Sequence, residues 1–348
     1  MADTTDATGT AGDDTVFERG STTRPDGAVL ATYAWVPAQA SRAVRGVIYL
    51  AHGMAEHAGR YDEFARFLAG RGYAVYSHDH RGHGLTATGD GRAGQLGHVA
   101  ASGGWDLLVG DLMARLAEVA QAHPGVKLAL VGHSMGSFLA REVAIRLSAD
   151  EARFTRGARL LRPLVEISAY VFVGTGGPKG PMLGVARRLA GSLTHLGSTR
   201  PSKVMDRAIF GEYNRPFAPA RTDFDWLSRD PAAVDDYVGD PLCGFVCTAA
   251  FYRDLLAGVA RVNSPANLTG LDPALPVLLI AGDADGVGDN GRGVRGAAAA
   301  LRTAGLTDVT CVLYRDARHE LLNETNKEVV MDTIANWLDI RLRERAES

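Results

Sequence analysis

Short apolar runs alternate with longer segments of helical period along most of this 348-residue chain. This alternation is typical of a mostly parallel sheet, because parallel strands are buried on both faces and are joined by crossover helices. We predict strands over Val29–Val36, Val47–Ala51, Ala74–Ser77, Leu128–Val131, Tyr170–Val173, Val277–Ala281 and Val309–Tyr314. We predict helices over Tyr61–Gly70, Gly104–Ala122, Ser137–Leu147, Gly293–Ala304 and Lys327–Arg343. The expected fold class is therefore α/β, with a mostly parallel central sheet covered by helices on both faces.

The interval from about Gly176 to Gly239 interrupts this rhythm, because it contains no apolar run of strand length. Asp230-Pro231 is typical of a helix start, with an N-cap aspartate and proline at the first helical position. One apolar stripe at helical spacing consists of Met182, Val185, Leu189, Leu193 and Leu196. We expect a helical insertion over 176–239 between two parts of the core, 15–175 and 240–348. The stripe is expected to pack on the core, or alternatively to line a lipophilic pocket or transiently touch a lipid surface.

The composition excludes several classes of protein. The formal net charge of −3 leaves no general attraction for nucleic acid. Residues 1–14 contain four aspartates and no basic residue, so we predict a disordered tail there. The sequence shows neither a secretory signal nor a membrane span, which favours a cytoplasmic protein. Three cysteines (Cys243, Cys247 and Cys311) are too few and too badly spaced for a disulfide framework or a zinc site, and we expect them to be small buried hydrophobes.

Gly132-His133-Ser134-Met135-Gly136 fits the pattern G-x-S-x-G, directly after a predicted strand and before a predicted helix. A nucleophile elbow needs this setting, because the serine sits on a sharp turn in which the glycines avoid steric clashes. Ser134 is therefore the candidate nucleophile, and its oxyanion-hole partner would be the backbone amide of the next residue, Met135. A second donor is expected after Val47–Ala51, which assigns the backbone amide of Met54 in His52-Gly53-Met54.

The base and the acid follow from chain order, which in such elbow enzymes is serine, then acid, then histidine. Only His195 and His319 follow Ser134. His319 comes after the last predicted strand and is the candidate base, whereas His195 lies inside the helical insertion without an acid placed to orient it. The acid should follow Val277–Ala281, where Asp283, Asp285 and Asp289 compete. Spacing favours Asp285, and the other two remain open. A calcium loop is excluded, because the twelfth residue from Asp283 is a valine.

His78-Asp79-His80-Arg81-Gly82-His83-Gly84 is dense in residue types that bind metals. No further cluster of such ligands follows in the middle of the chain, and a metal would leave the Ser134, Asp285 and His319 set unexplained. We therefore expect no metal and interpret this segment as a hydrogen-bonded loop that braces the site.

With these residues in place, the chain resembles the α/β-hydrolase family that contains monoacylglycerol lipases and bacterial lysophospholipases, often labelled serine aminopeptidase. The resemblance runs from about Gly46 to Leu338. It rests on His52–His57 with Arg60-Tyr61, Asp79–Gly84, Gly132–Gly136, Phe224–Asp230, Asp240-Pro241-Leu242, Gly282–Asp289 and His319-Glu320. It implies an α/β-hydrolase fold with a helical cap, the triad Ser134, Asp285 and His319, and oxyanion-hole amides at Met54 and Met135. The segment Ser148–Leu164 departs from the family pattern, because it looks longer and more basic.

The function implied is hydrolysis of the acyl ester of a small lipid, such as a monoacylglycerol or a lysophospholipid, without a cofactor. An aminopeptidase on the same triad is the first alternative, with Glu212, Asp223 or Asp225 holding a substrate ammonium group. A small-ester carboxylesterase is a second alternative. A binding module that has lost catalysis is disfavoured, because all three triad residues are present. Acyl-chain length and oligomeric state are not predicted.

Overall fold

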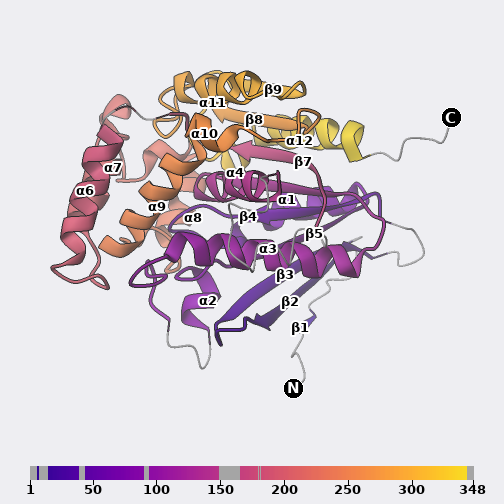
Figure 1. The fold of residues 1–348 in the computed structure, drawn as a ribbon, viewed down its shortest axis with the longest axis horizontal. Helices are drawn as coiled ribbons and strands as arrows, with labels where there is room; N and C mark the ends of the chain where they lie inside the picture. Colours follow the sequence, from indigo (N-terminus) through magenta and orange to yellow (C-terminus); the bar gives the residue numbers. More distant parts are fainter. Residues whose placement is uncertain are drawn as a thin grey trace.

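The described part of the chain builds a nine-stranded sheet. The computed structural model describes residues 6–7, 15–38, 44–89, 94–148, 165–178, 180 and 182–342. The strands there are β1 (Asp6–Ala7), β2 (Thr15–Thr23), β3 (Val29–Pro37), β4 (Gly46–Ala51), β5 (Tyr73–His78), β6 (Leu128–His133), β7 (Ile167–Val173), β8 (Val277–Gly282) and β9 (Val309–Tyr314). Their order is β1-β2-β3-β5-β4-β6-β7-β8-β9, with parallel pairing from β5 to β9 and antiparallel pairing from β1 to β5. The predicted α/β class and mostly parallel sheet are confirmed (Figure 1).

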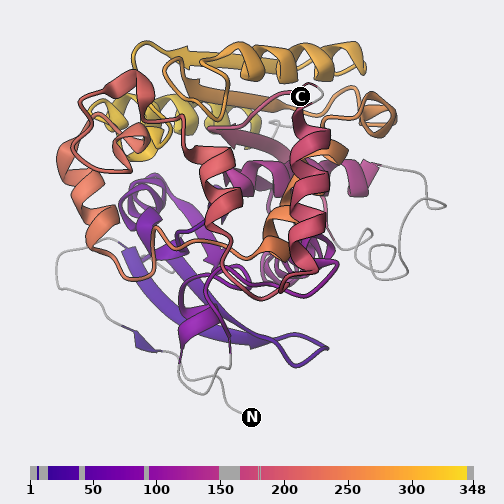
Figure 2. The ribbon, with the colours of Figure 1, turned by 90° about the vertical axis from the view of Figure 1, so that its left-hand side faces the viewer.

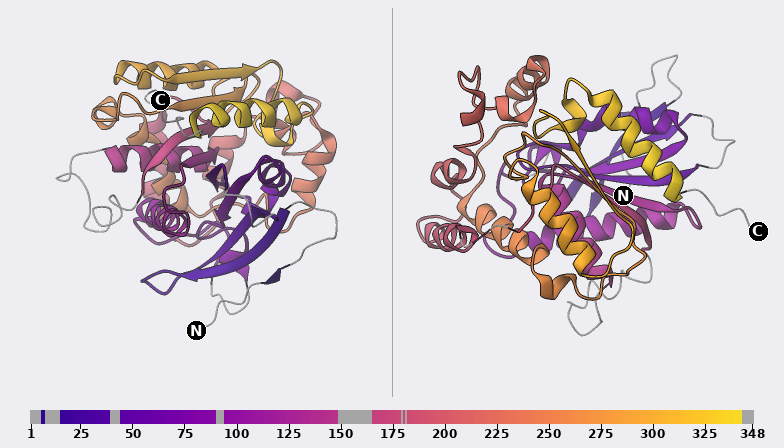
Figure 3. Two further views of the ribbon diagram at one scale, coloured as in Figure 1. Left: turned by 90° about the vertical axis from the view of Figure 1, so that its right-hand side faces the viewer. Right: turned by 90° about the horizontal axis from the view of Figure 1, so that it is seen from above.

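Helices cover both faces of this sheet. The helices of the core are α1 (Asp62–Gly70), α2 (Gly84–Thr88), α3 (Gly104–Ala122), α4 (Met135–Ser148), α9 (Ala249–Val262), α10 (Pro265–Leu268), α11 (Arg292–Thr303) and α12 (Lys327–Leu342). α1 and α12 pack on one face, whereas α3, α4, α9 and α11 pack on the other. Figure 3 (right) shows α11 and α12 on opposite sides of the sheet. Alternate strand residues enter opposite layers, as Ile48 and Tyr49 do, which is why the central strands are apolar throughout.

The differences from the predicted elements lie mainly at the edge of the sheet and beside α4. β2 was not predicted, because only two of its nine residues, Val16 and Phe17, are large and apolar. Asp6 and Ala7 lie inside the predicted disordered tail, but they pair with β2. α9 was also missed, although Thr248 caps it by accepting a hydrogen bond from the Phe251 amide. The rest of residues 1–14 and the basic segment 149–164 lie outside the described residues.

Helical elements also follow β7, where the rhythm of the sequence breaks. They are α6 (Met182–Thr194), α7 (Lys203–Phe210), η4 (Arg215–Phe217), η5 (Asp225–Leu227) and α8 (Pro231–Gly239). We call residues 182–239 the cap segment. It lies at one end of the sheet, and this end faces the viewer in Figure 2. Asp230 accepts a hydrogen bond from the Ala232 amide, which confirms the predicted N-cap.

The predicted apolar stripe of α6 is wrong in its orientation. Val185, Leu189 and Leu196 are 55%, 40% and 74% exposed, and none of them packs on the core. Of the stripe, Leu193 alone contacts the core among the residues whose side chains are described; the side chain of Met182 is not among them. The buried face consists instead of Leu183, Ala186, Ala190 and Leu193, which pack with the core on the side of α9. The positions of the alanines indicate this buried face, but the prediction considered only the large apolar residues.

Candidate active site

Ser134 stands on the sharp turn between β6 and α4. Its φ of +50° lies in the left-handed region, which serine rarely adopts. The Ser134 amide donates to the Val173 carbonyl oxygen at 2.9 Å, which fixes the turn against β7. A Cβ on Gly136 would lie 2.0 Å from the Ala51 carbonyl oxygen, and one on Gly132 would lie 2.3 Å from that of Gly136. Both glycines are therefore required, and the strand–turn–helix setting of a nucleophile elbow is present.

His319 and Asp285 meet beyond the ends of β9 and β8. The Nδ1 atom of His319 lies 3.0 Å from Oδ2 of Asp285, and both residues are buried. Asp285 Oδ1 accepts a second hydrogen bond, from the Val287 amide at 2.8 Å. A buried carboxylate in this position accepts a hydrogen bond from Nδ1–H, which keeps the proton on Nδ1 and leaves Nε2 as the proton acceptor. The structure thus pairs the two residues that the sequence nominated as acid and base.

The competing residues lie elsewhere. Asp283 accepts a hydrogen bond from the Asp316 amide at 2.7 Å. Asp289 forms an exposed ion pair with Arg292 at 2.9 Å. His195 is exposed, just after α6. Among the described histidines that follow Ser134, His319 is the one that joins a buried carboxylate.

The loop after β4 lies against the nucleophile. A Cβ on Gly53 would lie 3.2 Å from the Ser134 Cβ and 2.5 Å from Glu56 Oε1, so the chain passes close to the serine. The Gly53 amide donates to Oε1 of Glu56 at 2.6 Å and is therefore engaged. The next amide is that of Met54, and Met54 and Ser134 line the same cavity. Met135 begins α4, so its amide lies at a helix N-terminus, where negative charge is favoured.

The histidine-rich segment behind this loop is packed and hydrogen-bonded. The rings of His52 and His80 lie 4.1 Å apart, and burial lowers the pKa of His80 to about 3. Asp79 accepts hydrogen bonds from the amides of Ala58 and Leu85 and from the Tyr33 hydroxyl. These contacts join three segments of chain, as expected for a bracing loop.

One group of three ligand types converges elsewhere in the described residues, namely His57, Asp240 and Cys243. The His57 imidazole already donates from Nε2 to Asp240 at 2.8 Å, because its Nδ1 accepts from the Gly59 amide. Of the three cysteines, Cys247 is buried as expected, whereas Cys243 and Cys311 are half-buried, and all three are free.

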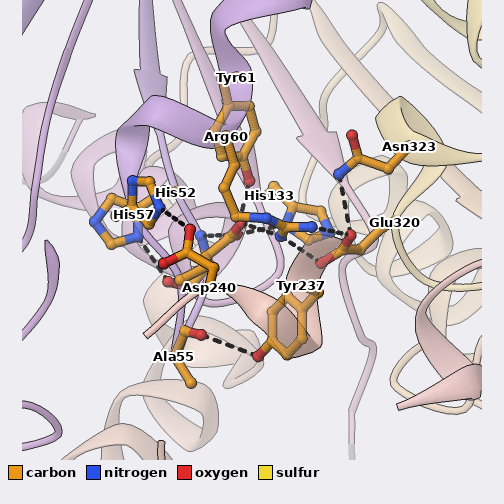
Figure 4. A network of polar contacts seen from close by, with 12 residues as sticks. His52, Ala55, His57, Arg60, Tyr61, His133, Tyr237, Asp240, Glu320 and Asn323 are labelled. Atoms are coloured by element: carbon orange, nitrogen blue, oxygen red, sulfur yellow. Dashed lines mark hydrogen bonds and ion pairs between the residues drawn. The ribbon is translucent and has the colours of Figure 1, made fainter. Parts of the chain in front are cut away.

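A buried network of charges that the sequence analysis missed lies beside the site (Figure 4). Arg60 donates to Glu56 Oε2 at 2.8 Å and to both carboxylate oxygens of Glu320 at 2.6 and 2.7 Å. Glu56 Oε1 also lies 3.1 Å from Nδ1 of His133 and accepts from the Tyr61 hydroxyl. The available signals were the i, i+4 spacing of Glu56 and Arg60 and the glutamate directly after His319.

The network is charged although it is buried. Burial by itself would raise the pKa of Glu56, but the hydrogen bond and charge of His133, and then the charge of Arg60, outweigh burial and hold this pKa well below its usual value. Burial likewise opposes the charge on Glu320, yet Arg60 keeps its pKa low. The pKa of His133 is raised, because its bond to Glu56 outweighs burial. Both carboxylates are therefore ionised at neutral pH.

A cavity of about 700 Å³ opens above Ser134 and His319. Its far walls come from α7, from the chain up to η5 and from residues 244–246, and they carry the aromatic side chains of Phe210, Phe224, Trp226 and Phe245. None of the α6 side chains that the structure describes lines this cavity, which corrects the predicted alternative of a stripe along its wall. Asp206 and Asp223 add two carboxylates. Glu212 pairs instead with Arg215, and Asp225 accepts from the Thr222 hydroxyl.

Backbone hydrogen bonds join the cap segment directly to the histidine loop. The amides of His319 and Glu320 donate to the carbonyl oxygens of Trp226 and Leu227 at 3.4 and 2.7 Å. The Trp226 ring lies 5.1 Å from the His319 imidazole, centroid to centroid. The part of the cap segment around η5 is therefore part of the wall that holds His319 in place.

This geometry agrees with the comparisons to known proteins. The family model described as serine aminopeptidase, S33, matches residues 42–326, which is most of the chain. The chain belongs to this family. This S33 hydrolase is 29% identical over 323 residues to the monoglyceride lipase of Mus musculus, covering 91% of the chain and 89% of that protein. It is 28% identical over 303 residues to the monoacylglycerol lipase of Mycolicibacterium smegmatis, covering 84% and 88%.

Solved structures support the same fold. A carboxyl esterase from Bacillus coagulans in complex with glycerol superimposes with a TM-score of 0.79 at 23% identity, covering 94% of this chain and 99% of the esterase. The α/β-hydrolase fold is thereby confirmed. The family match and the monoglyceride lipase relatives confirm the assignment of this S33 protein as a serine hydrolase.

Proposed function

We propose that the protein hydrolyses the acyl ester of a small lipid, such as a monoacylglycerol or a lysophospholipid, through an acyl-enzyme on Ser134. The observation that carries this proposal is the buried Asp285–His319 pair at 3.0 Å beside a serine on a strained elbow. The cap segment completes the site with an aromatic wall. Relatives at 28–29% identity are named monoglyceride and monoacylglycerol lipases, which supports the choice of substrate class.

The geometry supports the following mechanism. Ser134 Oγ attacks the ester carbonyl while Nε2 of His319 takes its proton, and Asp285 stabilises the imidazolium through Nδ1. The carbonyl oxygen becomes negative and accepts hydrogen bonds from the Met54 and Met135 amides. The imidazolium then protonates the leaving alcohol as the carbon–oxygen ester bond breaks. Water, activated by the same histidine, hydrolyses the acyl-enzyme and releases the acid. No step requires a cofactor or a metal.

The test of the nucleophile is covalent labelling. Wild type should be phosphonylated by a fluorophosphonate at Ser134, as identified by peptide mass spectrometry, and should hydrolyse acyl esters. Ser134→Ala should lose both activities while its thermal unfolding stays close to that of wild type. The matched control is Ser137→Ala, since Ser137 is buried in the first turn of α4 and its hydroxyl donates a hydrogen bond to the Ser134 carbonyl oxygen. Labelling that persists in Ser134→Ala would show that the nucleophile lies elsewhere.

The acyl chain is proposed to lie along the aromatic wall formed by Phe210, Phe224, Trp226 and Phe245. A buried methylene contributes about 0.8 kcal/mol, so each added methylene should raise kcat/KM by up to about fourfold until the cavity is filled. A panel of esters from acetate to palmitate, with glycerol and glycerophosphocholine as head groups, measures this slope. If acetate and butyrate esters are the best substrates, the protein is a small-ester carboxylesterase instead.

An aminopeptidase is the second candidate, because two carboxylates face the cavity. Asp223 was expected in this role, and Asp206 joins it, with its Oδ1 accepting from the Tyr252 hydroxyl at 2.8 Å. A substrate ammonium group could bind between them. Aminoacyl anilides distinguish the two activities: a peptidase cleaves them at a rate comparable with esters, and Asp223→Asn lowers that rate alone.

We also propose that the cap segment touches lipid surfaces transiently. Val185, Leu189 and Leu196 present apolar side chains to solvent beside Arg187 and Arg188. Of the described helices, none is both long enough and apolar enough to cross a bilayer. Co-sedimentation with vesicles should fall when Leu189 and Leu196 are both replaced by Asp, and hydrolysis of a water-soluble ester should stay unchanged. Equal sedimentation of both proteins would exclude this contact.

A further inference from the structure

Glu56 makes four hydrogen bonds, and two of them reach segments that each carry a proposed catalytic group. Oε1 accepts from the Gly53 amide at 2.6 Å, next to Met54 and its proposed oxyanion amide. The same oxygen lies 3.1 Å from the ring of His133, the residue before Ser134. Oε2 accepts from Arg60 at 2.8 Å. The fourth bond comes from the Tyr61 hydroxyl.

Arg60 extends this connection to the third segment. Its guanidinium binds both oxygens of Glu320, the residue directly after His319. Two parallel bonds of this kind fix the direction of both planar groups and not only the distance between them. The opposite side of Glu320 is held by Asn323 Nδ2 at 3.0 Å and by the bond from its own amide to Leu227. Figure 4 shows the Arg60 side chain reaching toward Glu320, which Asn323 contacts as well.

The network is also shielded from water. Glu56 and Glu320 are 3% and 4% exposed, and the Arg60 side chain is 11% exposed and lies 4.8 Å from the ring centre of Tyr237. In such surroundings hydrogen bonds are strong and misplaced charges are costly, so the arrangement is held to one geometry. Ala55, the residue before Glu56, has a φ of +55°, and its carbonyl oxygen is held by the Tyr237 hydroxyl and the Gly244 amide. The loop that contains Ala55 and Glu56 is thus held both by the bonds to the Ala55 carbonyl oxygen and by the bonds to the Glu56 side chain.

We infer that Glu56, acting through Arg60 and Glu320, is the positioning residue that aligns the oxyanion loop, the nucleophile elbow and the histidine loop with one another. None of its contacts is with the reacting atoms. Its contacts with Gly53 and His133 are instead with direct sequence neighbours of groups that the proposed mechanism uses. Its contact with Arg60 leads on to Glu320, the neighbour of His319. The inference rests on the proposed roles of Ser134, His319 and Met54.

The consequence for catalysis is a loss of alignment with little loss of substrate binding. Glu56→Gln keeps the size of the side chain but replaces one acceptor oxygen by a donor, so Gly53, Tyr61, His133 and Arg60 can no longer all be satisfied. A displacement of about 1 Å at such a site costs roughly 100-fold in rate. The cavity wall that would contact the acyl chain, which includes Phe210 and Phe245, is not bonded to Glu56.

The test compares three glutamates in the full-length protein. Glu142 is the matched control: it is fully buried and paired with Arg146 and Arg261 at 2.9 Å, but it lies outside the site. For Glu56→Gln, Glu320→Gln and Glu142→Gln, we would measure kcat and KM for p-nitrophenyl butyrate and the rate constant of fluorophosphonate labelling, each per folded molecule from circular dichroism. We expect kcat and the labelling rate to fall about 100-fold in Glu56→Gln, with KM within about threefold of wild type. Glu320→Gln should also lower kcat and the labelling rate, whereas Glu142→Gln should lower only the stability of the protein.

Several outcomes would overturn the inference. It fails if Glu56→Gln keeps kcat within about threefold of wild type, or if Glu142→Gln loses as much as Glu56→Gln, because the effect would then be that of any buried charge. If Glu56→Gln does not fold, Arg60→Lys decides: lysine keeps the charge but not the paired bonds to Glu320, so an unchanged kcat and labelling rate would refute the inference. Wild type that is not labelled at Ser134 would refute the proposed function itself, which is a separate result.

Discussion

Replacing Asp285 by asparagine tests the proposed acid, because it removes the hydrogen bond between Asp285 and Nδ1 of His319. Asp285 Oδ1 accepts from the Val287 amide at 2.8 Å, so an asparagine would place its carbonyl oxygen there and turn its NH₂ group toward Nδ1 of His319. Two donors would then face each other at the 3.0 Å now spanned by a hydrogen bond. The imidazole relieves this conflict by moving its proton to Nε2, the nitrogen that must accept the proton of Ser134. We therefore expect kcat to fall by roughly 10³–10⁴, or about 4–5.5 kcal/mol in activation free energy.

The assay is steady-state hydrolysis of p-nitrophenyl butyrate with active sites counted by fluorophosphonate labelling. Asp289→Asn is the matched control, because Asp289 follows the same strand but only pairs with exposed Arg292, and such pairs contribute about 0–1 kcal/mol. Its kcat should stay within about threefold of wild type. Asp283→Asn should also cost far less than Asp285→Asn, since Asp283 bonds only a backbone amide. An active Asp285→Asn beside an inactive Asp283→Asn or Asp289→Asn would mean that the acid is misassigned.

Three other perturbations test separate parts of the structure. Gly136→Ala should remove activity and lower the free energy of unfolding, measured by urea denaturation, by about 1–3 kcal/mol, because the new Cβ would meet the Ala51 carbonyl oxygen. A variant as stable as wild type would show that the elbow can relax. Phe210→Ala should reduce turnover of decanoate esters more than of acetate esters, whereas Leu189→Asp should leave this ratio unchanged; the opposite pattern would place the acyl chain on α6. The pKa of Glu56 is lower in the folded protein than its value of 4.5 in the unfolded chain, so its negative charge stabilises the fold above pH 4.5. This contribution is lost as the pH falls through the pKa of the folded state. The difference in free energy of unfolding between wild type and Glu56→Gln should thus become smaller from pH 7 to about pH 3.5. A difference that stays constant over this range would contradict the charge assigned to Glu56.

The sequence predicted those parts of the molecule whose physics is local. Seven strands of the sheet were visible as apolar runs, because burial on both faces requires apolar side chains at every position. Ser134 was recognisable because its elbow needs glycines two residues before and after it. Asp285 was favoured over its neighbours by spacing, and the structure places it against His319.

The parts that were missed depend on contacts between distant segments. Glu56 and Glu320 lie 264 positions apart, and no sequence pattern or period links them. Only the fold brings both to Arg60. The buried face of α6 was misjudged because Ala186 and Ala190 pack closely with the core, whereas the larger Val185 and Leu189 point to solvent. Helical spacing shows that a helix has two faces, but it does not show which one a neighbouring helix will cover.

The bonds from Trp226 and Leu227 to the histidine loop set a boundary for protein engineering. Exchanging caps between related hydrolases is an obvious route to new chain-length preferences. A graft that ends after η5 would replace the carbonyl groups that receive the His319 and Glu320 amides, and with them the side chain that lies against the imidazole. A graft confined to residues 182–222 leaves those groups native and still exchanges α7, which contributes Phe210 to the cavity. Libraries of chimaeras should therefore be joined before Phe224, because the residues that follow it bind the loop of the proposed base, His319.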